Sequence, residues 1–545
     1  MSAPGDISSA SSDGAKPSST TSLAADAWAQ TAETSPDWRP VIKWEEGRLP
    51  AIVEQAEQAL LAMPQLNVFQ RGPMLVRPAR AYQRTVRDVA RPYAVSPTVR
   101  LIEQPLLVEV LTRAAHWLRY DKRRGANVEV NCPKDVAATY LANVGHWRLR
   151  HLAGVISAPT LRPDGSILQN PGYDDATGVY LDPCGVDFPA VPDRPTRKQA
   201  QQALTELQWP LREFPFLDEV DESVALALVL TSLVRRSLPT APMGAITAPV
   251  MASGKTLLAD YVSIIATGAS AAAVSFPASE EEAEKVALAT LIAGEPIMLL
   301  DNVERPLEGA WLCSILTSET YSGRWLGRSE MVSVPSAILV LATGNQLSLV
   351  GDLRTRALLC RIDPRIEHPE QRSFDWDLRV WATAHRPEVV AAGLTVMRAY
   401  LTSGAKVQMP QWGRFERWSQ MVRAPLLWLD QPDPCANLKQ LEDEDPQRAE
   451  LLQVMEAWHA AFGNEKHIVR EVVDWALRET DSDSSVGTLR EALQQVALDR
   501  GQINSRRLGR WLLRNADRIC AGRQFQRAGE RQGVVQWQLI NIGDF

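Results

Sequence analysis

Cysteine is scarce in this chain: there are six among 545 residues, and they are widely spread. They form no C-x-x-C pair, and no histidine stands near any of them at the spacing of a zinc finger. A disulfide framework and the common zinc sites are therefore excluded. The pattern predicts reduced, mostly buried thiols, as in proteins of the cytoplasm.

Long apolar runs are missing as well. The longest extends from Val224 to Val234, contains Thr231 and Ser232, and is too short to cross a bilayer. The N-terminus lacks the basic stretch and the apolar core of a secretory signal. We therefore expect a cytoplasmic protein that has no membrane partner.

Positive charge is not in excess. The 58 Lys and Arg residues face 65 Asp and Glu residues, which gives a formal net charge of −7. Contact with a nucleic acid would therefore depend on local patches of charge and not on the average. The hydrophobic fraction of 45% is ample for sizeable cores, and the length is typical of three or four domains.

The most informative motif spans residues 248–256. It follows the short apolar run 245–247, ends in Ser253-Gly254-Lys255-Thr256, and leads into a helix-like pattern. A loop of this kind holds phosphates with its backbone N–H groups, its Lys reaches the β- and γ-phosphates, and its Thr binds Mg²⁺. Pro249 and Ala252 stand where many such loops have glycine.

The sequence therefore predicts ATP and Mg²⁺ as ligands. The residues assigned to ATP binding are Pro249, Val250, Met251, Ala252, Ser253, Gly254, Lys255 and Thr256.

Further strands follow the loop in an informative order. Residues 297–301 form an apolar run that ends in Asp301, and residues 337–345 form a second one that ends in Asn345. A buried parallel strand of the first kind delivers a carboxylate to the Mg²⁺ shell at the edge of the sheet. Strands are also expected at 271–275 and 358–362. A helix capped by Ser279 is expected between the strands at 271–275 and 297–301. Alternating strands and helices predict an α/β fold with a doubly wound parallel sheet.

Several motifs carry a family resemblance over about residues 215–365. They are the segments 300–306 (Leu-Asp-Asn-Val-Glu-Arg-Pro), 326–330 (Leu-Gly-Arg-Ser-Glu), 342–345 (Ala-Thr-Gly-Asn) and 351–354 (Gly-Asp-Leu-Arg). They resemble the AAA+ class of P-loop ATPases, and within it the superfamily 3 helicases and the primase-helicase proteins of phages and mobile elements. The resemblance implies that Asp301 holds Mg²⁺ with Thr256, and that Asn345 senses the γ-phosphate.

One departure from this family concerns the catalytic base. Many AAA+ proteins have Glu directly after the Walker B Asp, whereas Asn302 follows Asp301 here and the next acid is Glu304. An amide cannot accept the proton. Glu304 polarises the attacking water, or Asp301 serves in both roles, or hydrolysis is slow; we favour Glu304.

The resemblance also assigns roles to arginines. Arg354 or Arg356 would be the finger that completes a neighbouring subunit's site in a ring, most simply a hexamer. A hairpin over residues 324–334 would enter the pore and contact single-stranded DNA through Arg324 and Arg328. The alternative for Arg328 is an ion pair with Glu330 across the turn.

Composition divides the chain as follows: a disordered tail at 1–35, an α+β accessory domain at 36–186, a linker and helical segment at 187–238, the ATPase core at 239–365, a helical lid at 366–430 and a helical connector at 431–465. Within the accessory domain we expect a helix at 106–118 and a hairpin around Asp164-Gly165. Its only paired acids, Asp174 and Asp175, are adjacent and would face opposite ways on a strand, so primase activity is not predicted.

Residues 466–545 carry a second functional signal. Ser505 is expected to cap a helix on which Arg506, Arg510 and Arg514 share one face, and two strands follow as a β-wing. This pattern predicts a winged-helix-like domain that binds duplex DNA. Its candidate contacts are Arg506, Arg507, Arg510, Arg514, Arg527 and Arg531. The alternative is a domain that docks another protein.

Together these motifs predict a ring-forming, ATP-dependent DNA helicase or translocase of a phage or mobile element, acting in DNA replication. The alternative is a DNA-binding AAA+ switch or loader with slow hydrolysis and no processive unwinding. Asn302 and the substituted phosphate loop favour the switch, whereas the hairpin around Arg328 favours the motor.

Overall fold

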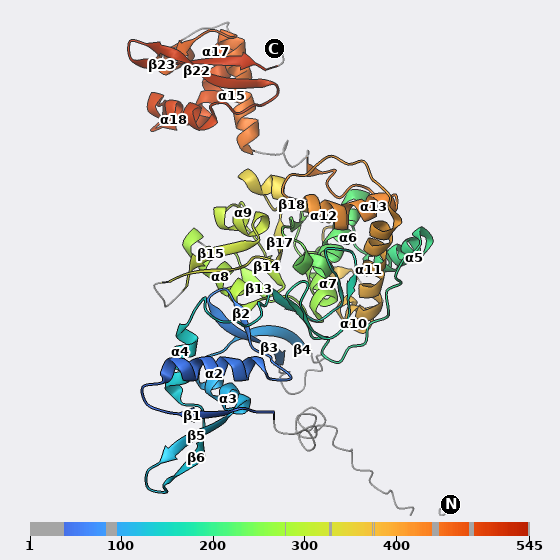
Figure 1. Ribbon diagram of the computed structural model, residues 1–545. Coiled ribbons are helices and arrows are strands. Elements are labelled where there is room, and N and C mark those ends of the chain that lie inside the picture. Colours follow the sequence, from blue (N-terminus) through green and yellow to red (C-terminus); the bar gives the residue numbers. More distant parts are fainter. Residues whose placement is uncertain are drawn as a thin grey trace, which may run out of the picture. The chain divides into compact units, whose positions relative to one another are not determined.

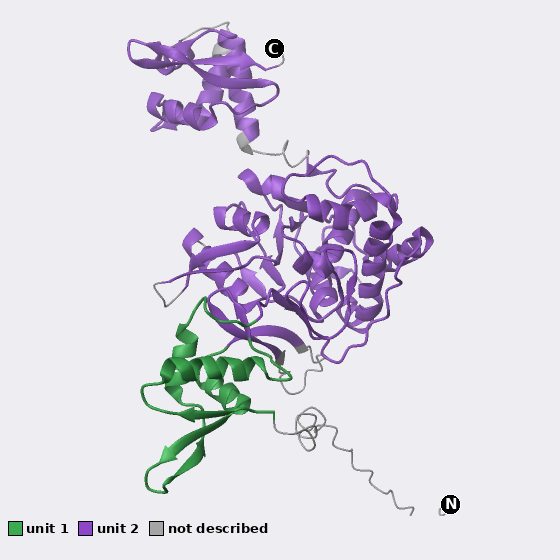
Figure 2. Ribbon diagram, viewed as in Figure 1, with its two compact units in different colours: residues 1–68, 102–149 green, residues 69–101, 150–545 purple. Residues whose placement is uncertain are grey.

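The computed structural model describes residues 38–82, 95–277, 279–325, 330–372, 374, 376–438, 446–478 and 484–542. The predicted tail at 1–35 and Arg328 lie outside this range. Contacts divide the chain into two compact units, one made of Met1–Val68 and Ile102–Leu149, the other of Phe69–Leu101 and Arg150–Phe545 (Figure 2). None of the described helices is both long and apolar enough to cross a membrane.

The described residues of the first unit form a small sheet and three helices (Figure 1). Its elements are β1 (Val41–Trp44), α2 (Leu49–Leu61), α3 (Gln104–Ala114), β5 (His116–Asp121), β6 (Ala126–Val130) and α4 (Lys134–Ala142). Strand β5 lies between β1, which is parallel to it, and β6, which is antiparallel. The helix predicted to reach residue 118 ends at Ala114, because Trp117 and Leu118 belong to β5.

The second unit is built on a five-stranded parallel sheet in the order β13-β14-β17-β12-β18. Its strands are β12 (Met243–Ala248), β13 (Ala273–Ser275), β14 (Ile297–Asp301), β17 (Leu339–Asn345) and β18 (Ala357–Arg361). The mixed α/β class and the parallel sheet predicted from the sequence are confirmed.

Both faces of this sheet are buried. Along β14, Ile297 and Leu299 enter one hydrophobic cluster, whereas Met298 and Leu300 enter another. The first cluster receives residues of α6 (Glu219–Val234), α7 (Lys255–Thr267) and α11 (Arg386–Ser403). The second receives residues of α8 (Glu280–Ala293) and α9 (Ala310–Thr317). Such burial on both faces explains why the strands read as continuous apolar runs.

The predicted accessory domain at 36–186 does not form one body. Residues 69–101 and 150–186 belong to the second unit, and Arg71 shows how they are held. Its guanidinium donates to the carbonyls of Leu152 (3.3 Å) and Leu291 (3.0 Å), so it ties these segments to the end of α8. The strands here are β2 (Phe69–Arg71), β3 (Met74–Tyr82), β4 (Val95–Leu101), β7 (Gly154–Ile156), β8 (Thr160–Leu161), β9 (Ile167–Leu168), β10 (Gly172–Asp174) and β11 (Val179–Leu181).

The predicted lid at 366–430 shares its core with the rest of the unit. Val390, Leu394 and Trp418 lie in the same buried cluster as α6, and Trp418 Nε1 donates to Thr231 Oγ1 at 2.8 Å. The other α-helices of this region are α10 (Leu378–Ala384), α12 (Glu416–Trp418) and α13 (Ala424–Trp428), and α5 (Arg197–Gln208) lies in the predicted linker and helical segment.

The C-terminal part has a hydrophobic core of its own, to which Trp458, Trp511 and Phe525 contribute. Its elements are α15 (Pro446–Phe462), β19 (His467–Ile468), α16 (Val469–Ala476), α17 (Ser484–Ala497), β20 (Leu498–Asp499), β21 (Gln502–Ile503), α18 (Ser505–Asn515), β22 (Arg523–Arg531) and β23 (Val534–Asn541). The predicted boundary at 466 therefore moves to 446, since Trp458 of α15 belongs to this core. Helices followed by a β22–β23 hairpin match the predicted order of elements.

Candidate functional site

The loop at 249–254 joins β12 to α7. Ala252 (φ 57°) and Gly254 (φ 98°) both adopt left-handed backbone conformations, which turn the chain sharply into the helix. Ser253 Oγ donates to the carbonyl of Val250 at 2.7 Å and closes the loop on itself. The first N–H groups of α7 have no partner within the helix, so this helix end presents several donors beside the loop.

Lys255 reaches back across this loop. Its side chain is buried, and its ammonium group donates to Val250 O (2.9 Å) and to Asn345 Oδ1 (2.7 Å). Burial lowers the pKa of Lys255, and the charge of Asp301 partly opposes this effect. The predicted lysine and the predicted sensor are therefore in direct contact.

Sheet order explains how these residues meet. Strand β17 lies between β12 and β14, so the carboxyl ends of all three strands reach the same edge of the sheet. Asp301 Oδ1 accepts a hydrogen bond from Thr256 Oγ1 at 3.0 Å. The structure thus brings together Lys255 and Thr256 with Asp301 and Asn345, which follow more than 40 residues later in the sequence.

Thr343 belongs to the same cluster, although the sequence analysis missed it. Its hydroxyl donates to Asp301 Oδ1 at 2.5 Å and accepts from the backbone N–H of Asn302 at 3.1 Å. Both bonds to Asp301 therefore use Oδ1. A hydroxyl residue directly after the apolar run 339–342 is the signal that could have pointed to this role. Thr343 is a positioning residue that fixes the carboxylate.

The chain turns abruptly after Asp301. Asn302 has a φ of 53°, and its Nδ2 donates to Glu304 Oε1 at 2.9 Å. Glu304 itself is exposed. Gly344 makes this turn possible, because a Cβ there would lie 2.5 Å from the carbonyl of Val303. Asn302 thereby holds the carboxylate of Glu304. The sequence did not predict this contact.

A cavity of about 550 Å³ opens beside Ser253 and Gly254. Its lining includes Phe214, Leu257, Phe374, Trp376, Arg372 and Arg379. Glu213 joins the two segments that form the walls: its carboxylate accepts from Trp376 Nε1 at 2.7 Å, and its carbonyl accepts from Arg372 at 2.8 Å. The sequence did not predict this cavity. One of its two wall segments precedes β12 in the chain and the other follows β18, so all five strands of the sheet lie between them in sequence.

The two candidate finger arginines lie on the short 3₁₀ helix η3 (Gly351–Arg356). Arg354 is buried, and its Nε donates to Gly351 O at 3.4 Å. The guanidinium of Arg356 donates to Cys313 O at 3.2 Å and to Asp352 at 2.9 Å. The side chain of Arg356 is 14% exposed, but that of its partner Asp352 is 75% exposed, so this ion pair borders the surface.

The predicted pore hairpin is formed by β15 (Thr320–Arg324) and β16 (Met331–Pro335). Arg324 is exposed and is in register with Met331, of which 69% is exposed. Arg328 and its alternative ion pair with Glu330 fall outside the described residues.

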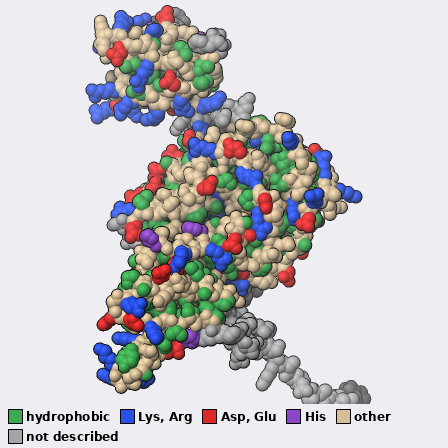
Figure 3. Space-filling view, in the orientation of Figure 1, with side chains coloured by type: hydrophobic (Ala, Val, Ile, Leu, Met, Phe, Trp, Pro, Cys, Tyr) green, Lys and Arg blue, Asp and Glu red, His purple; other side chains and the backbone are tan. Residues whose placement is uncertain are grey.

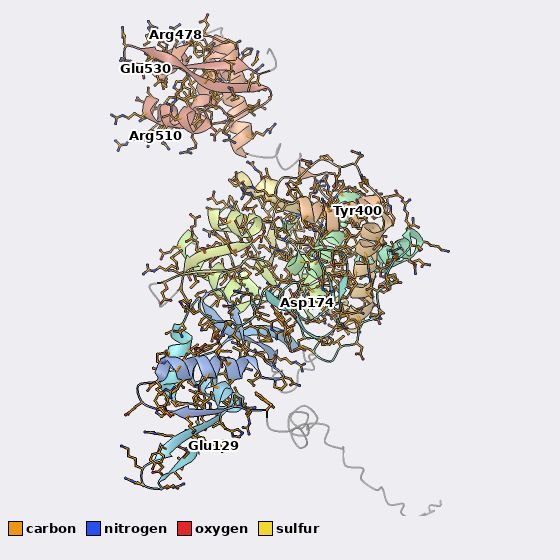
Figure 4. The ribbon with its side chains drawn as sticks, viewed as in Figure 1. Glu129, Asp174, Tyr400, Arg478, Arg510 and Glu530 are labelled. Carbon is orange, nitrogen blue, oxygen red and sulfur yellow. The ribbon has the colours of Figure 1, made fainter. Side chains whose placement is uncertain are left out.

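The six C-terminal arginines predicted to contact DNA are all exposed. Arg510 lies on the side of α18 turned away from the domain's core (Figure 4), and Lys and Arg side chains gather along this helix (Figure 3). Among the described residues, Arg507 pairs with Asp499 at 3.9 Å and Arg531 with Glu471 at 3.0 Å. The predicted cap Ser505 is wrong: Asn504 Oδ1 accepts from the N–H groups of Arg506 and Arg507, because the helix begins at Ser505, one residue earlier than predicted.

The described residues contain no group of three or more His, Cys, Asp or Glu side chains that could hold a metal ion. Mg²⁺ that arrives with phosphates needs only one or two protein oxygens. Thr256 Oγ1 and Asp301, whose Oδ2 is not used by either hydrogen bond described above, are the oxygens that could supply them.

Comparison with known proteins gives a distant likeness. No protein-family model and no curated protein matches the chain. An apo structure of the NrS-1 C-terminal region matches at 12% identity and a TM-score of 0.35, over 80% of this chain and 98% of that one. A second structure of that region matches at 12% identity and a TM-score of 0.34, over 81% and 100%. A likeness this distant supports no inference about activity.

Proposed function

We propose that residues 239–365 form a P-loop ATPase core of the AAA+ class. The observation that carries this proposal is the convergence of Lys255, Thr256, Asp301 and Asn345 at one edge of the sheet, with hydrogen bonds of 2.7–3.0 Å between them. Lys255 would neutralise the β- and γ-phosphates, and Asn345 would sense the γ-phosphate. Thr256 and Asp301 would hold Mg²⁺, which supplies Lewis-acid stabilisation of phosphate charge.

The described residues fit ATP beyond the phosphate loop. The cavity beside Gly254 has about 550 Å³, and nucleotide-sized ligands occupy sites of roughly 300–1,000 Å³. Phe214 and Trp376 offer aromatic faces for a base, and Gly254 carries no side chain that would separate this cavity from the loop. A β-carbon at position 254 would lie 3.4 Å from Phe214 in a strained backbone conformation.

Glu304 is the proposed general base. Replacing Glu304 by glutamine is expected to slow ATP hydrolysis by about 10²-fold while ATP still binds, because the amide cannot accept a proton. The Asn302–Glu304 hydrogen bond at 2.9 Å supports this assignment. Single-turnover hydrolysis and direct ATP binding would be measured. The matched control is Glu308→Gln, which changes another exposed glutamate of the same loop. If Glu304→Gln hydrolyses ATP normally and Asp301→Asn does not, the general base is Asp301.

We further propose that copies of this chain assemble as a ring, most simply a hexamer. Exposed apolar side chains line the cavity or stand next to its lining residues in the chain: Trp209 (44%), Met251 (73%), Phe374 (49%) and Val380 (60%). Monomeric proteins rarely leave such a patch uncovered. A second copy seated here would bury these side chains and bring its own arginine to the loop site.

The work of this ring would be translocation on, or unwinding of, DNA in the replication of a phage or mobile element. This part of the proposal rests on the family resemblance, on the exposed Arg324 of the β15–β16 hairpin and on the arginines of α18. Single-stranded DNA would pass along the hairpin, and duplex DNA would meet a winged-helix-like C-terminal domain.

The C-terminal arginines provide a test of the duplex contact. Replacing Arg506, Arg510 and Arg514 together by glutamine is expected to weaken duplex binding for every sequence and to reduce its salt slope by about 0.9 per lost phosphate contact. Fluorescence anisotropy between low and moderate salt measures both quantities. Unchanged affinity and slope would mean that this domain docks a protein instead.

A nucleotide-dependent switch or loader is the second candidate, and Asn302 after Asp301 favours it. The rate of ATP hydrolysis with and without single-stranded DNA distinguishes the two. A motor is expected to hydrolyse faster when DNA is present, whereas a slow rate that DNA does not change would favour the switch.

A further inference from the structure

The β5–β6 hairpin extends beyond the sheet that supports it. Strand β1 pairs with His116–Arg119 only, whereas the pairing of β5 with β6 continues to Asp121 and Ala126. In the part of the chain that the structure describes, residues 120–126 therefore form a tip with no neighbouring strand on the β1 side (Figure 1). Such a tip can reach a ligand without disturbing the fold.

The tip is basic. Arg119, Lys122, Arg123 and Arg124 are exposed, and Figure 3 shows Lys and Arg side chains gathered at the end of this hairpin. The local acid, Asp121, is engaged in the turn: it accepts from the N–H of Arg123 at 2.8 Å and pairs with Arg124 at 3.7 Å. Among the described residues, Arg119, Lys122 and Arg123 form no ion pair.

An aromatic side chain stands beside these charges. Tyr120 is 57% exposed and lies on the same face of the sheet as Leu118, Lys43 and Val41, of which Val41 is 56% exposed. The opposite face carries Ile42 and Trp117, each 1% exposed, and also Arg119. Glu129, labelled in Figure 4, is in register with Leu118 and so lies on the Tyr120 face, where its carboxylate is 2.8 Å from His116 Nδ1.

We propose that this hairpin binds single-stranded nucleic acid. Lys122 and Arg123 in the turn would contact phosphates, and Tyr120 would stack on a base. Positive charge next to an exposed ring on an uncovered sheet face is the combination that single-stranded nucleic acid requires, since its phosphates and its unstacked bases are both accessible. An acidic protein would use the charges but would not need Tyr120. The site is separate from the ATPase and from α18, so it does not depend on the proposed function.

The phosphate contacts are tested by the double variant Lys122→Gln, Arg123→Gln of the full chain. Binding of a fluorescent 30-nucleotide oligo-dT is measured by anisotropy at several salt concentrations. Each lost contact is expected to reduce the log–log salt slope by about 0.7, which is about 1.4 for the two. The matched control removes two exposed charges elsewhere (Arg194→Gln, Lys406→Gln) and should leave the slope unchanged.

The stacking contact is tested by Tyr120→Ala. Affinity for oligo-dT is expected to fall roughly 5- to 150-fold with an unchanged salt slope, because a ring is lost and no charge is removed. A duplex of the same length should be much less sensitive to this change. Basal ATP hydrolysis without DNA should stay at the wild-type rate in all these variants, so a failure of the ATPase proposal would be seen separately.

Three outcomes would overturn the proposal. One is an unchanged salt slope in the double variant, and a second is an equal loss in the control. The third is a double variant that loses binding to a poly-glutamate peptide while its oligo-dT affinity is intact. If the double variant melts at a lower temperature, Lys122→Arg with Arg123→Lys, which preserves charge, must retain the wild-type slope.

Discussion

Replacing Lys255 by alanine is expected to lower the rate of ATP hydrolysis by about 10²–10³-fold or more and to weaken ATP binding. The ammonium group lies between Val250 O and Asn345 Oδ1, at the end of the loop where phosphate charge would be held. Its removal deletes a cation that solvent cannot replace in a buried place. Steady-state hydrolysis and direct ATP binding would be measured on the same preparation.

The control for this variant is Lys285→Ala. Lys285 lies on α8, away from the loop, and pairs with Glu281 at 2.9 Å. The Lys285→Ala variant loses the same charge at a position away from the loop. It should therefore retain wild-type hydrolysis. Thermal melting should show both variants folded. The Lys255 ammonium donates to two acceptors, and its side chain belongs to no hydrophobic cluster among the described residues. Wild-type ATP affinity and hydrolysis in a folded Lys255→Ala protein would remove the basis of the ATPase proposal.

Replacing Arg356 by alanine is expected to lower hydrolysis by about 10³–10⁵-fold if this residue is the finger. We favour Arg356 over Arg354 because its ion pair with Asp352 borders the surface, whereas Arg354 is buried. A neighbouring phosphate would then compete with Asp352 for the same guanidinium.

Mixing two inactive variants tests whether the site is shared between copies. An equimolar mixture of Arg356→Ala and Lys255→Ala is expected to recover hydrolysis, since about a quarter of head-to-tail interfaces would pair an intact loop with an intact arginine. The same mixture with Arg354→Ala examines the other candidate. Recovery with neither arginine would place the finger elsewhere or show that none exists.

Much of the sheet was readable from the sequence because its strands are buried on both faces. The run 297–301 is β14 with the predicted bounds, and Ser279 caps α8 as expected, with its hydroxyl accepting from Glu282 N at 3.3 Å. These features depend on residues close together in the chain. Periodicity and capping chemistry are therefore sufficient to find them.

The parts that could not be predicted depend on residues brought together from a distance. Thr343 reaches Asp301 only because β17 lies beside β14, and no local pattern states the order of strands. The wall formed by Phe214 and Trp376 has the same origin. At α3 the apolar periodicity continued into Trp117 and Leu118, and tertiary pairing with β1 made these residues a strand.

The path of the chain between its two units limits how the protein can be shortened. Residues 69–101 interrupt the first unit in sequence but belong to the second, so a fragment that begins at 150 would lose them. The carbonyls that Arg71 serves at Leu152, Ala153 and Leu291 would then have no donor from this segment, at about 1–3 kcal/mol for each buried group left unsatisfied. Val99 and Met74 would leave a hydrophobic cluster that also contains Met298 and Leu300 of β14. A stable ATPase fragment should therefore begin at residue 69 and replace 102–149 with a short linker, which is a deletion in the middle of the chain and not a truncation at its end.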